Sequence, residues 1–175
     1  QSATRYTGNG FSIKQIQEIR QRISRNFERP PLARLAIQDI LDIAREVLPE
    51  DGSLISETGA FIPALEHLWQ VKSPRTYWGT SGGRSMGLML PATLGAKLAR
   101  PDLPMIGLGG DGSFLMRLGE LEVFARTGIA VPLLVVNDQA LGTMKWRQKN
   151  RSMTDYALDF YPVDLAGVAK SCGLN

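Results

Sequence analysis

The sequence contains very little cysteine and histidine, with one residue of each in 175. A single cysteine, Cys172, excludes a disulfide within the chain and a metal site built on several cysteines. The one histidine, His67, lies between Glu66 and Leu68 in a segment with helical spacing, where we expect a surface or packing role. A protein without disulfides fits a reducing compartment, so we expect a cytoplasmic location.

Long apolar runs and a strong charge of one sign are also missing. The apolar run at 131–136 (VPLLVV) is far too short to cross a bilayer, and the first residues do not resemble a signal peptide. The net charge is +3, from 20 basic and 17 acidic residues, and no run of Lys or Arg occurs. We therefore expect neither a membrane nor a nucleic acid as a partner.

The 43% hydrophobic content is sufficient for a folded core. A capping box, Ser12 to Gln15, predicts a first helix that ends before Pro30-Pro31. From there, helical and apolar strand-like segments alternate: helices are predicted at 37–48, 61–71, 88–98, 113–127 and 163–175, and strands at 53–56, 76–79, 104–108 and 131–137. Wholly apolar strands indicate burial on both faces. The predicted fold is α/β, a doubly wound, mostly parallel sheet with helices on both faces.

Three loops rich in glycine and small polar residues follow predicted strands. They are SETG (56–59), GGDGS (109–113) and NDQALG (137–142). In a doubly wound sheet, ligands bind beyond the carboxyl ends of the strands. We therefore expect the three loops to meet in one binding site.

The glycine loop allows two interpretations. The spacing Gly107-x-Gly109-x-x-Gly112 fits a dinucleotide-binding turn, with Asp138 as the acid that holds a ribose, so an NAD(P)-binding Rossmann domain of an oxidoreductase is one alternative. However, the Asp111 carboxylate in the same turn repels a bare pyrophosphate. A Mg²⁺ ion shared by Asp111 and Asp138 reverses that repulsion. The loop is therefore better interpreted as a metal–diphosphate clamp.

These motifs resemble those of a known family. GDGSF (110–114), followed by a helix and a strand ending in NDQALG, resembles the thiamine-diphosphate motif. Residues 85–114 are similar to the cofactor-binding domain of acetolactate synthases and benzoylformate decarboxylases. The resemblance implies an interdomain arm with one helix at 1–30 and a thiamine-diphosphate- and Mg²⁺-binding domain at 31–175. It also implies truncation of that domain at its C-terminal end, because family members continue with another strand and helix.

The resemblance implies roles for individual positions. The Asp111 and Asp138 side chains and the Ala140 carbonyl would bind Mg²⁺. Met86 would support the bent shape of the cofactor, and the carbonyl of residue 84 would accept a hydrogen bond from the aminopyrimidine. The implied cofactor-binding set, which includes the glycines and Ser113 beside the diphosphate and a substrate-facing pair at 143–144, is Glu57, Thr58, Gly59, Arg84, Ser85, Met86, Gly110, Asp111, Gly112, Ser113, Asp138, Ala140, Leu141, Gly142, Thr143 and Met144.

Several positions depart from the family pattern. Arg84 stands where the family usually has glycine; its carbonyl is still available to the cofactor, and entry of its guanidinium into the site is left open. Met144 stands where pyruvate decarboxylase-like enzymes carry an acidic residue, which favours a carboligase or an aryl-type decarboxylase. Trp146 and Gln148 resemble both subfamilies, and Met144 and Trp146 are equally compatible with plain core positions.

The implied activity is decarboxylation of a small 2-oxo acid with transfer to a second carbonyl compound, as in acetolactate synthases. The alternatives are a benzoylformate decarboxylase-like lyase and a regulatory or assembly domain without turnover. The activating glutamate of the family belongs to a pyrimidine-binding domain, of the same or another chain, so no catalytic residue is expected here.

We expect a fragment of a longer enzyme or a small subunit of a split one, in a homodimer or homotetramer. An FAD site would lie in a preceding domain, so this sequence does not determine whether the enzyme binds FAD.

Overall fold

The computed structural model describes residues 10–29, 35–80 and 82–175. Residues 1–9 of the predicted arm and the Pro30-Pro31 pair lie outside these ranges. Helix α1 (Ile13–Asn26) begins at the predicted capping box, in which the Ser12 hydroxyl accepts a hydrogen bond from the Gln15 amide (3.3 Å) and the Gln15 side chain accepts one from the Ser12 amide (2.8 Å). The predicted start of this helix is confirmed.

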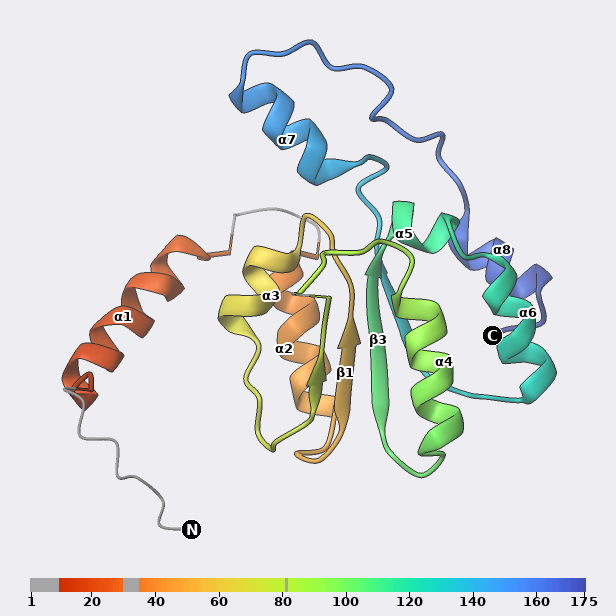
Figure 1. Cartoon of the computed structure of the whole chain (residues 1–175), viewed down its shortest axis with the longest axis horizontal. Helices are drawn as coiled ribbons and strands as arrows, with labels where there is room; N and C mark the ends of the chain where they lie inside the picture. Colours follow the sequence, from red (N-terminus) through yellow and green to blue (C-terminus); the bar gives the residue numbers. More distant parts are fainter. Residues whose placement is uncertain (1–9, 30–34, 81) are drawn as a thin grey trace.

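The centre of the fold is a four-stranded parallel sheet with the strand order β2-β1-β3-β4. The strands are β1 (Ser53–Ser56), β2 (Tyr77–Trp78), β3 (Met105–Gly110) and β4 (Leu133–Val136). The chain runs outward from β1 to β2 and then crosses back, so β3 lies on the other side of β1 (Figure 1). The point where the strand order reverses therefore lies between β1 and β3.

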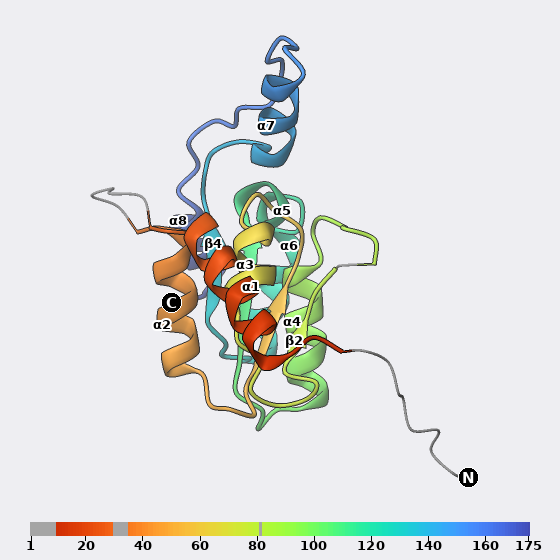
Figure 2. The ribbon, with the colours of Figure 1, turned by 90° about the vertical axis from the view of Figure 1, so that its left-hand side faces the viewer.

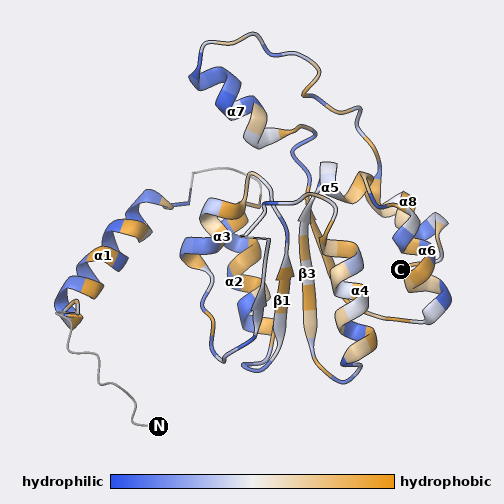
Figure 3. Ribbon diagram, viewed as in Figure 1, coloured by the Kyte–Doolittle hydropathy of each residue, from blue (hydrophilic) through white to orange (hydrophobic). Residues whose placement is uncertain are grey.

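Helices cover both faces of the sheet. Helices α2 (Ile37–Val47) and α3 (Ile62–Leu68) share one hydrophobic core with β1 and β3. On the other face, α4 (Met89–Ala99), α5 (Asp111–Leu115) and α6 (Gly119–Thr127) form a second core, against which α8 (Leu165–Ser171) packs. Figure 3 shows apolar residues along the strands and on the inward sides of these helices. The predicted doubly wound α/β fold is confirmed.

The single helix predicted at 113–127 is wrong, because the structure has two helices there. Helix α5 ends at Leu115 and α6 begins at Gly119, with a turn in which the Arg117 amide donates to the Phe114 carbonyl (3.0 Å) and the Glu120 amide to the Arg117 carbonyl (2.9 Å). The break lies beside Gly119, a residue type that disfavours a helix interior. It still allows both segments to contribute side chains to the same core.

Other predicted boundaries shift by a few residues. Helix α3 is shorter than the predicted 61–71, and α8 occupies only the middle of the predicted 163–175. Strand β3 extends beyond the predicted 104–108, because Gly109 and Gly110 still pair with Val135 and Val136. Within the described ranges, no helix has the length and hydrophobicity needed to cross a bilayer.

Candidate functional site

The three predicted loops meet at one edge of the sheet. The strands β1, β3 and β4 are adjacent and parallel and end at Ser56, Gly110 and Val136, so their following loops leave the same edge. The loops after β1 and β3 flank the point where the strand order reverses. This is the usual ligand position in an open α/β sheet.

Asp111 provides the strongest sign of a ligand at this edge. It is only 3% exposed, and its Oδ1 accepts a hydrogen bond from the Gly112 amide (2.7 Å). Its Oδ2 is buried and has no hydrogen-bond partner among the described residues. A buried carboxylate oxygen without a partner is costly, typically by about 1–3 kcal/mol or more. A divalent cation at this oxygen removes that cost, so Asp111 fits the predicted metal-ligand role.

Asp138 lies next to Asp111. Partial burial raises the pKa of the Asp138 carboxyl, and the negative charge of Asp111 raises this pKa further. Asp138 Oδ1 accepts a hydrogen bond from the Ala140 amide (3.3 Å), and a Cβ at Gly142 would overlap Asp138 Oδ2. Two neighbouring carboxylates that repel each other are a suitable pair for one Mg²⁺ ion. The structure therefore brings the two predicted side-chain ligands together.

The backbone at Ala140 is held by a returning segment of the chain. Ala140 forms an antiparallel bridge with Asp159, in which the Leu141 amide donates to the Leu158 carbonyl (2.8 Å) and the Phe160 amide to the Gln139 carbonyl (2.7 Å). These bonds involve the neighbours of Ala140, so the amide and carbonyl of Ala140 itself point away from the returning segment, and the amide donates to Asp138 Oδ1. This orientation fits the predicted carbonyl ligand.

Side chains alone do not complete a metal site. Among residues 10–29, 35–80 and 82–175, no group of three or more His, Cys, Asp or Glu side chains is placed to hold a metal ion. A cation at Asp111 and Asp138 would need backbone, water and ligand oxygens in addition. Mg²⁺ is typically bound in this way, by one or two carboxylates together with substrate phosphates.

The first two glycines of the dinucleotide spacing have a packing role. Gly107 and Gly109 lie inside β3, paired with Leu133 and Val135. A Cβ at Gly107 would lie 2.8 Å from the Met89 sulfur, and one at Gly109 would overlap Glu57 Oε1. In a dinucleotide-binding turn, such glycines form the turn after the strand. Here they permit close contact of α4 and Glu57 with β3, which removes the main support for the dinucleotide interpretation.

The predicted residues after β1 and before α4 lie at different depths. Glu57 is buried, Thr58 and Gly59 are half-buried, and Ser85 and Met86 are exposed. Arg84 has a left-handed backbone (φ 47°), and its Nη2 lies 3.7 Å from Glu66 Oε2 on α3. The Arg84 guanidinium therefore pairs with α3.

The predicted substrate-facing residues lie on α7 (Gly142–Asn150). This helix stands beyond the carboxyl ends of the strands in both views (Figures 1 and 2). Thr143 is half-buried, whereas Met144 and Trp146 are 45% and 65% exposed. The structure therefore excludes the alternative that Met144 and Trp146 are core residues of this chain.

The sequence analysis missed four residues at this edge, namely Lys145, Asp155, Asp159 and Phe160. Lys145 of α7 forms ion pairs with Asp159 (2.5 Å) and Asp155 (3.8 Å), which link the helix to the returning segment. The Phe160 ring lies against Gly112, where a Cβ would be 2.9 Å from Phe160 Cε2. Residues 151–163 contain no regular helix or strand, so no periodic signal could identify Phe160.

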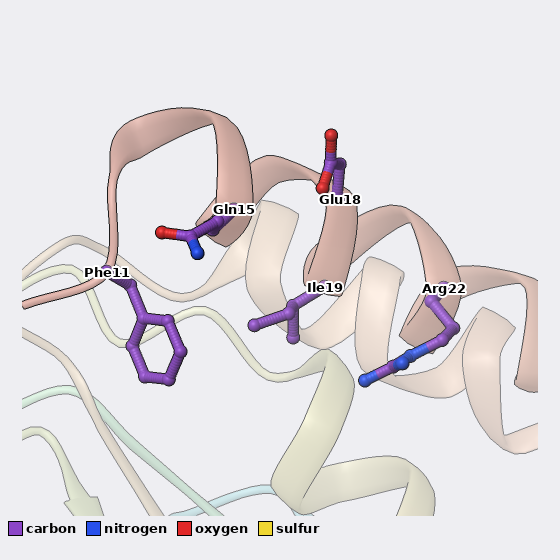
Figure 4. Close-up of a pocket in the computed structure, with 5 residues that line it drawn as sticks. All are labelled: Phe11, Gln15, Glu18, Ile19 and Arg22. Carbon is purple, nitrogen blue, oxygen red and sulfur yellow. The ribbon is translucent and has the colours of Figure 1, made fainter.

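A separate hollow lies along α1. It is lined by Phe11, Gln15, Glu18, Ile19 and Arg22, and Figure 4 shows Phe11, Ile19 and Arg22 pointing to the same side of the helix. None of these residues belongs to the predicted site. The hollow therefore contributes nothing to the candidate cofactor site.

Glu57 leads to a pH prediction. Burial raises the pKa of the Glu57 carboxyl above its usual 4.5, although hydrogen bonds from Met89, Leu88 and Ser113 lower it. A raised pKa means that the stability linked to this group is complete below its unfolded pKa and is lost as the pH rises through its folded pKa. We expect the unfolding free energy of the wild type to fall relative to that of Glu57→Gln above pH 4.5.

Urea denaturation between about pH 4 and pH 8 measures this difference. Glu46→Gln, at an exposed position of α2, is the control, and its difference from the wild type should stay constant over the same range. A constant difference for Glu57→Gln as well would contradict the prediction.

Comparison with known proteins identifies the family. The model of the family "Thiamine pyrophosphate enzyme, C-terminal TPP binding domain" matches residues 57–175. The chain belongs to this family, in agreement with the resemblance found from its motifs.

Two curated relatives illustrate the similarity. The 3D-(3,5/4)-trihydroxycyclohexane-1,2-dione hydrolase of Bacillus velezensis is 33% identical over 135 residues, which are 73% of this chain and 21% of that protein. The chloroplastic acetolactate synthase of Arabidopsis thaliana is 35% identical over 114 residues, which are 61% of this chain and 17% of that protein. The chain thus spans about a fifth of the length of these relatives.

A solved structure shares the fold. The thiamine diphosphate-dependent 4-hydroxybenzoylformate decarboxylase of Rhodococcus jostii RHA1 aligns with a TM-score of 0.71 and 25% sequence identity. The alignment covers 83% of this chain and 30% of that chain. Most of the fold described above therefore occurs in a thiamine diphosphate-dependent enzyme.

Proposed function

We propose that this chain is the thiamine-diphosphate- and Mg²⁺-binding domain of an acetolactate synthase-like enzyme that decarboxylates a 2-oxo acid and transfers the product to a second carbonyl compound. The observation that carries the proposal is the buried, unpaired Oδ2 of Asp111 next to the Asp138 carboxyl. Family membership supports the cofactor, and the two carboxylates support the metal.

The residues of this chain would bind and orient the cofactor. Asp111, Asp138 and the Ala140 carbonyl would hold Mg²⁺, with the diphosphate bound beside it at Gly112, Ser113 and Gly142. The bound cofactor would supply the nucleophile and the electron sink for decarboxylation. The activating glutamate would come from a pyrimidine-binding domain of the same or another chain, in a homodimer or homotetramer.

A lyase related to benzoylformate decarboxylase is a second candidate. The similarity to a 4-hydroxybenzoylformate decarboxylase favours it, as do the exposed apolar side chains of Met144 and Trp146 on α7. The decarboxylase is named for a 2-oxo acid and the hydrolase for a 1,2-dione. Both names support a substrate with a reactive carbonyl group for this chain.

Cofactor binding tests the proposal directly. We expect thiamine diphosphate to quench the tryptophan fluorescence of the protein in the presence of Mg²⁺, because Trp146 lies on the helix that begins at Gly142. EDTA should reverse the quenching, and NADH should have no saturable effect. Quenching by NADH, or thiamine diphosphate binding that ignores Mg²⁺, would contradict the proposed site.

Activity separates the candidate enzymes from a domain without turnover. With its pyrimidine-binding domain present, the protein should release CO₂ from pyruvate and form a carboligation product. Release of CO₂ from benzoylformate, with an aldehyde as the product, would favour the lyase. Cofactor binding without turnover of either substrate would favour an assembly role.

A further inference from the structure

The Glu57 carboxylate is buried at the edge of the sheet where β1 and β3 end, yet the sequence offers no role for it other than cofactor contact. It is 1% exposed, although it immediately follows the end of β1. A buried carboxylate needs several hydrogen bonds to offset the loss of water. The partners of Glu57 therefore indicate what it does.

The backbone contacts of Glu57 lie at the start of α4 and at Gly87 just before it. Its Oε2 accepts hydrogen bonds from the Leu88 amide (2.6 Å) and the Met89 amide (3.0 Å). The N-cap residue of α4, Leu88, has no side chain that could cap the helix. Glu57, 31 residues earlier in the chain, therefore satisfies amides that the helix leaves free.

The other carboxylate oxygen lies against the glycine loop. A Cβ at Gly109 would overlap Glu57 Oε1, and the Ser113 hydroxyl also bonds to the carboxylate. One side chain thus joins the end of β1, the start of α4 and the turn that carries Asp111. Leu88 is two residues after Met86, so the position of the Met86 loop depends on the same contacts.

We propose that Glu57 is a positioning residue, which does not contact the cofactor and instead sets the distance between the Met86 loop and the Asp111 turn. This inference rests on the proposed function. The carboxylate occupies the N-terminus of α4, so that helix is closed to a phosphate. The anionic part of the cofactor is then directed to the Asp111 and Gly142 turns.

The acceptor atom, rather than the charge, performs this role. Both amides donate to the same oxygen, Oε2, so the amide oxygen of a glutamine can accept both bonds. Glu57→Gln should therefore behave like the wild type, whereas Glu57→Ala removes the acceptor and Glu57→Asp is too short to reach α4. Loss of an outer contact that orients a metal site typically weakens binding about 10- to 100-fold.

The experiment uses the protein together with its pyrimidine-binding domain and titrates thiamine diphosphate at saturating Mg²⁺. Hydrogen exchange at the Leu88 and Met89 amides is measured in parallel without ligand. Glu57→Ala and Glu57→Asp should raise the Kd about 10-fold or more and accelerate exchange at both amides, and Glu57→Gln should do neither. Asp164→Ala is the matched control, because Asp164 likewise caps a helix, α8 through the Gly167 amide (2.9 Å), but makes no contact with α4, and its Kd should match the wild type.

An unchanged Kd in Glu57→Ala would overturn the inference, as would a Glu57→Gln variant that binds as weakly as Glu57→Asp. If Glu57→Ala does not fold, the Kd of Glu57→Gln compared with that of Glu57→Asp still tests whether the acceptor atom positions the site. Failure of the wild type to bind thiamine diphosphate would instead reject the proposed function. The exchange rates at Leu88 and Met89 would then still report whether Glu57 holds the start of α4.

Discussion

Asp111→Ala is expected to weaken the Mg²⁺-dependent binding of thiamine diphosphate by about 100-fold or more, because even outer contacts of a metal site are worth about 10- to 100-fold. The variant removes the buried Oδ2 that lacks a partner and leaves Asp138 as the remaining carboxylate of the predicted metal-binding pair. The affinity is measured by fluorescence titration with thiamine diphosphate at a series of Mg²⁺ concentrations.

Stability should not decrease together with affinity. Asp111→Asn keeps the acceptor for the Gly112 amide and removes the repulsion with Asp138, so its melting temperature without ligand should equal or exceed that of the wild type. Asp102→Ala, at an exposed position before β3 and therefore at the opposite edge of the sheet, is the control for affinity. Binding that remains equally dependent on Mg²⁺ in Asp111→Ala would exclude Asp111 as a ligand.

Phe114→Ala is expected to lower the unfolding free energy by about 3–5 kcal/mol, the usual cost of deleting a buried aromatic ring. Phe114 is 3% exposed and packs in the core formed by α4, α5 and α6. Its ring also packs the short helix α5 against this core, and α5 begins at Asp111 and includes Ser113. We therefore expect a second effect, a weaker affinity for thiamine diphosphate with Mg²⁺.

Phe124→Ala is the matched control for this second effect. Phe124 is 1% exposed and belongs to the same core, but it lies on α6. Both variants should lose similar stability in urea denaturation, and only Phe114→Ala should raise the Kd, measured at a temperature where both proteins are folded. Equal affinities for the two variants would show that α5 does not depend on Phe114 for its position.

Much of the fold was predictable because its signals are local. Apolar segments identified the four strands of the described sheet, and the parallel arrangement followed from burial on both faces. The boundaries at 113–127 were not predictable, because one continuous helical pattern is compatible with either one helix or two. The turn at residues 116–118 depends on how Phe114 and Phe124 enter a common core.

The position of Asp111 next to Asp138 was also predictable. Both residues follow the ends of strands, and the carboxyl ends of adjacent parallel strands lie at the same edge. The glycine spacing was more ambiguous, since the same pattern occurs in dinucleotide-binding turns. Only the structure shows that Gly107 and Gly109 lie inside β3, where α4 and Glu57 approach the strand.

By itself, the sequence determined the α/β class, the edge of the sheet where the candidate site lies and the neighbouring pair of carboxylates, Asp111 and Asp138. These conclusions depend on residue type and on order along the chain. The tertiary structure alone decided that Glu57 caps α4 and that the segment around Phe160 covers the Gly112 turn. Each of these contacts joins residues that are far apart in the chain, and no local periodicity encodes which distant backbone amide or glycine a buried side chain will meet.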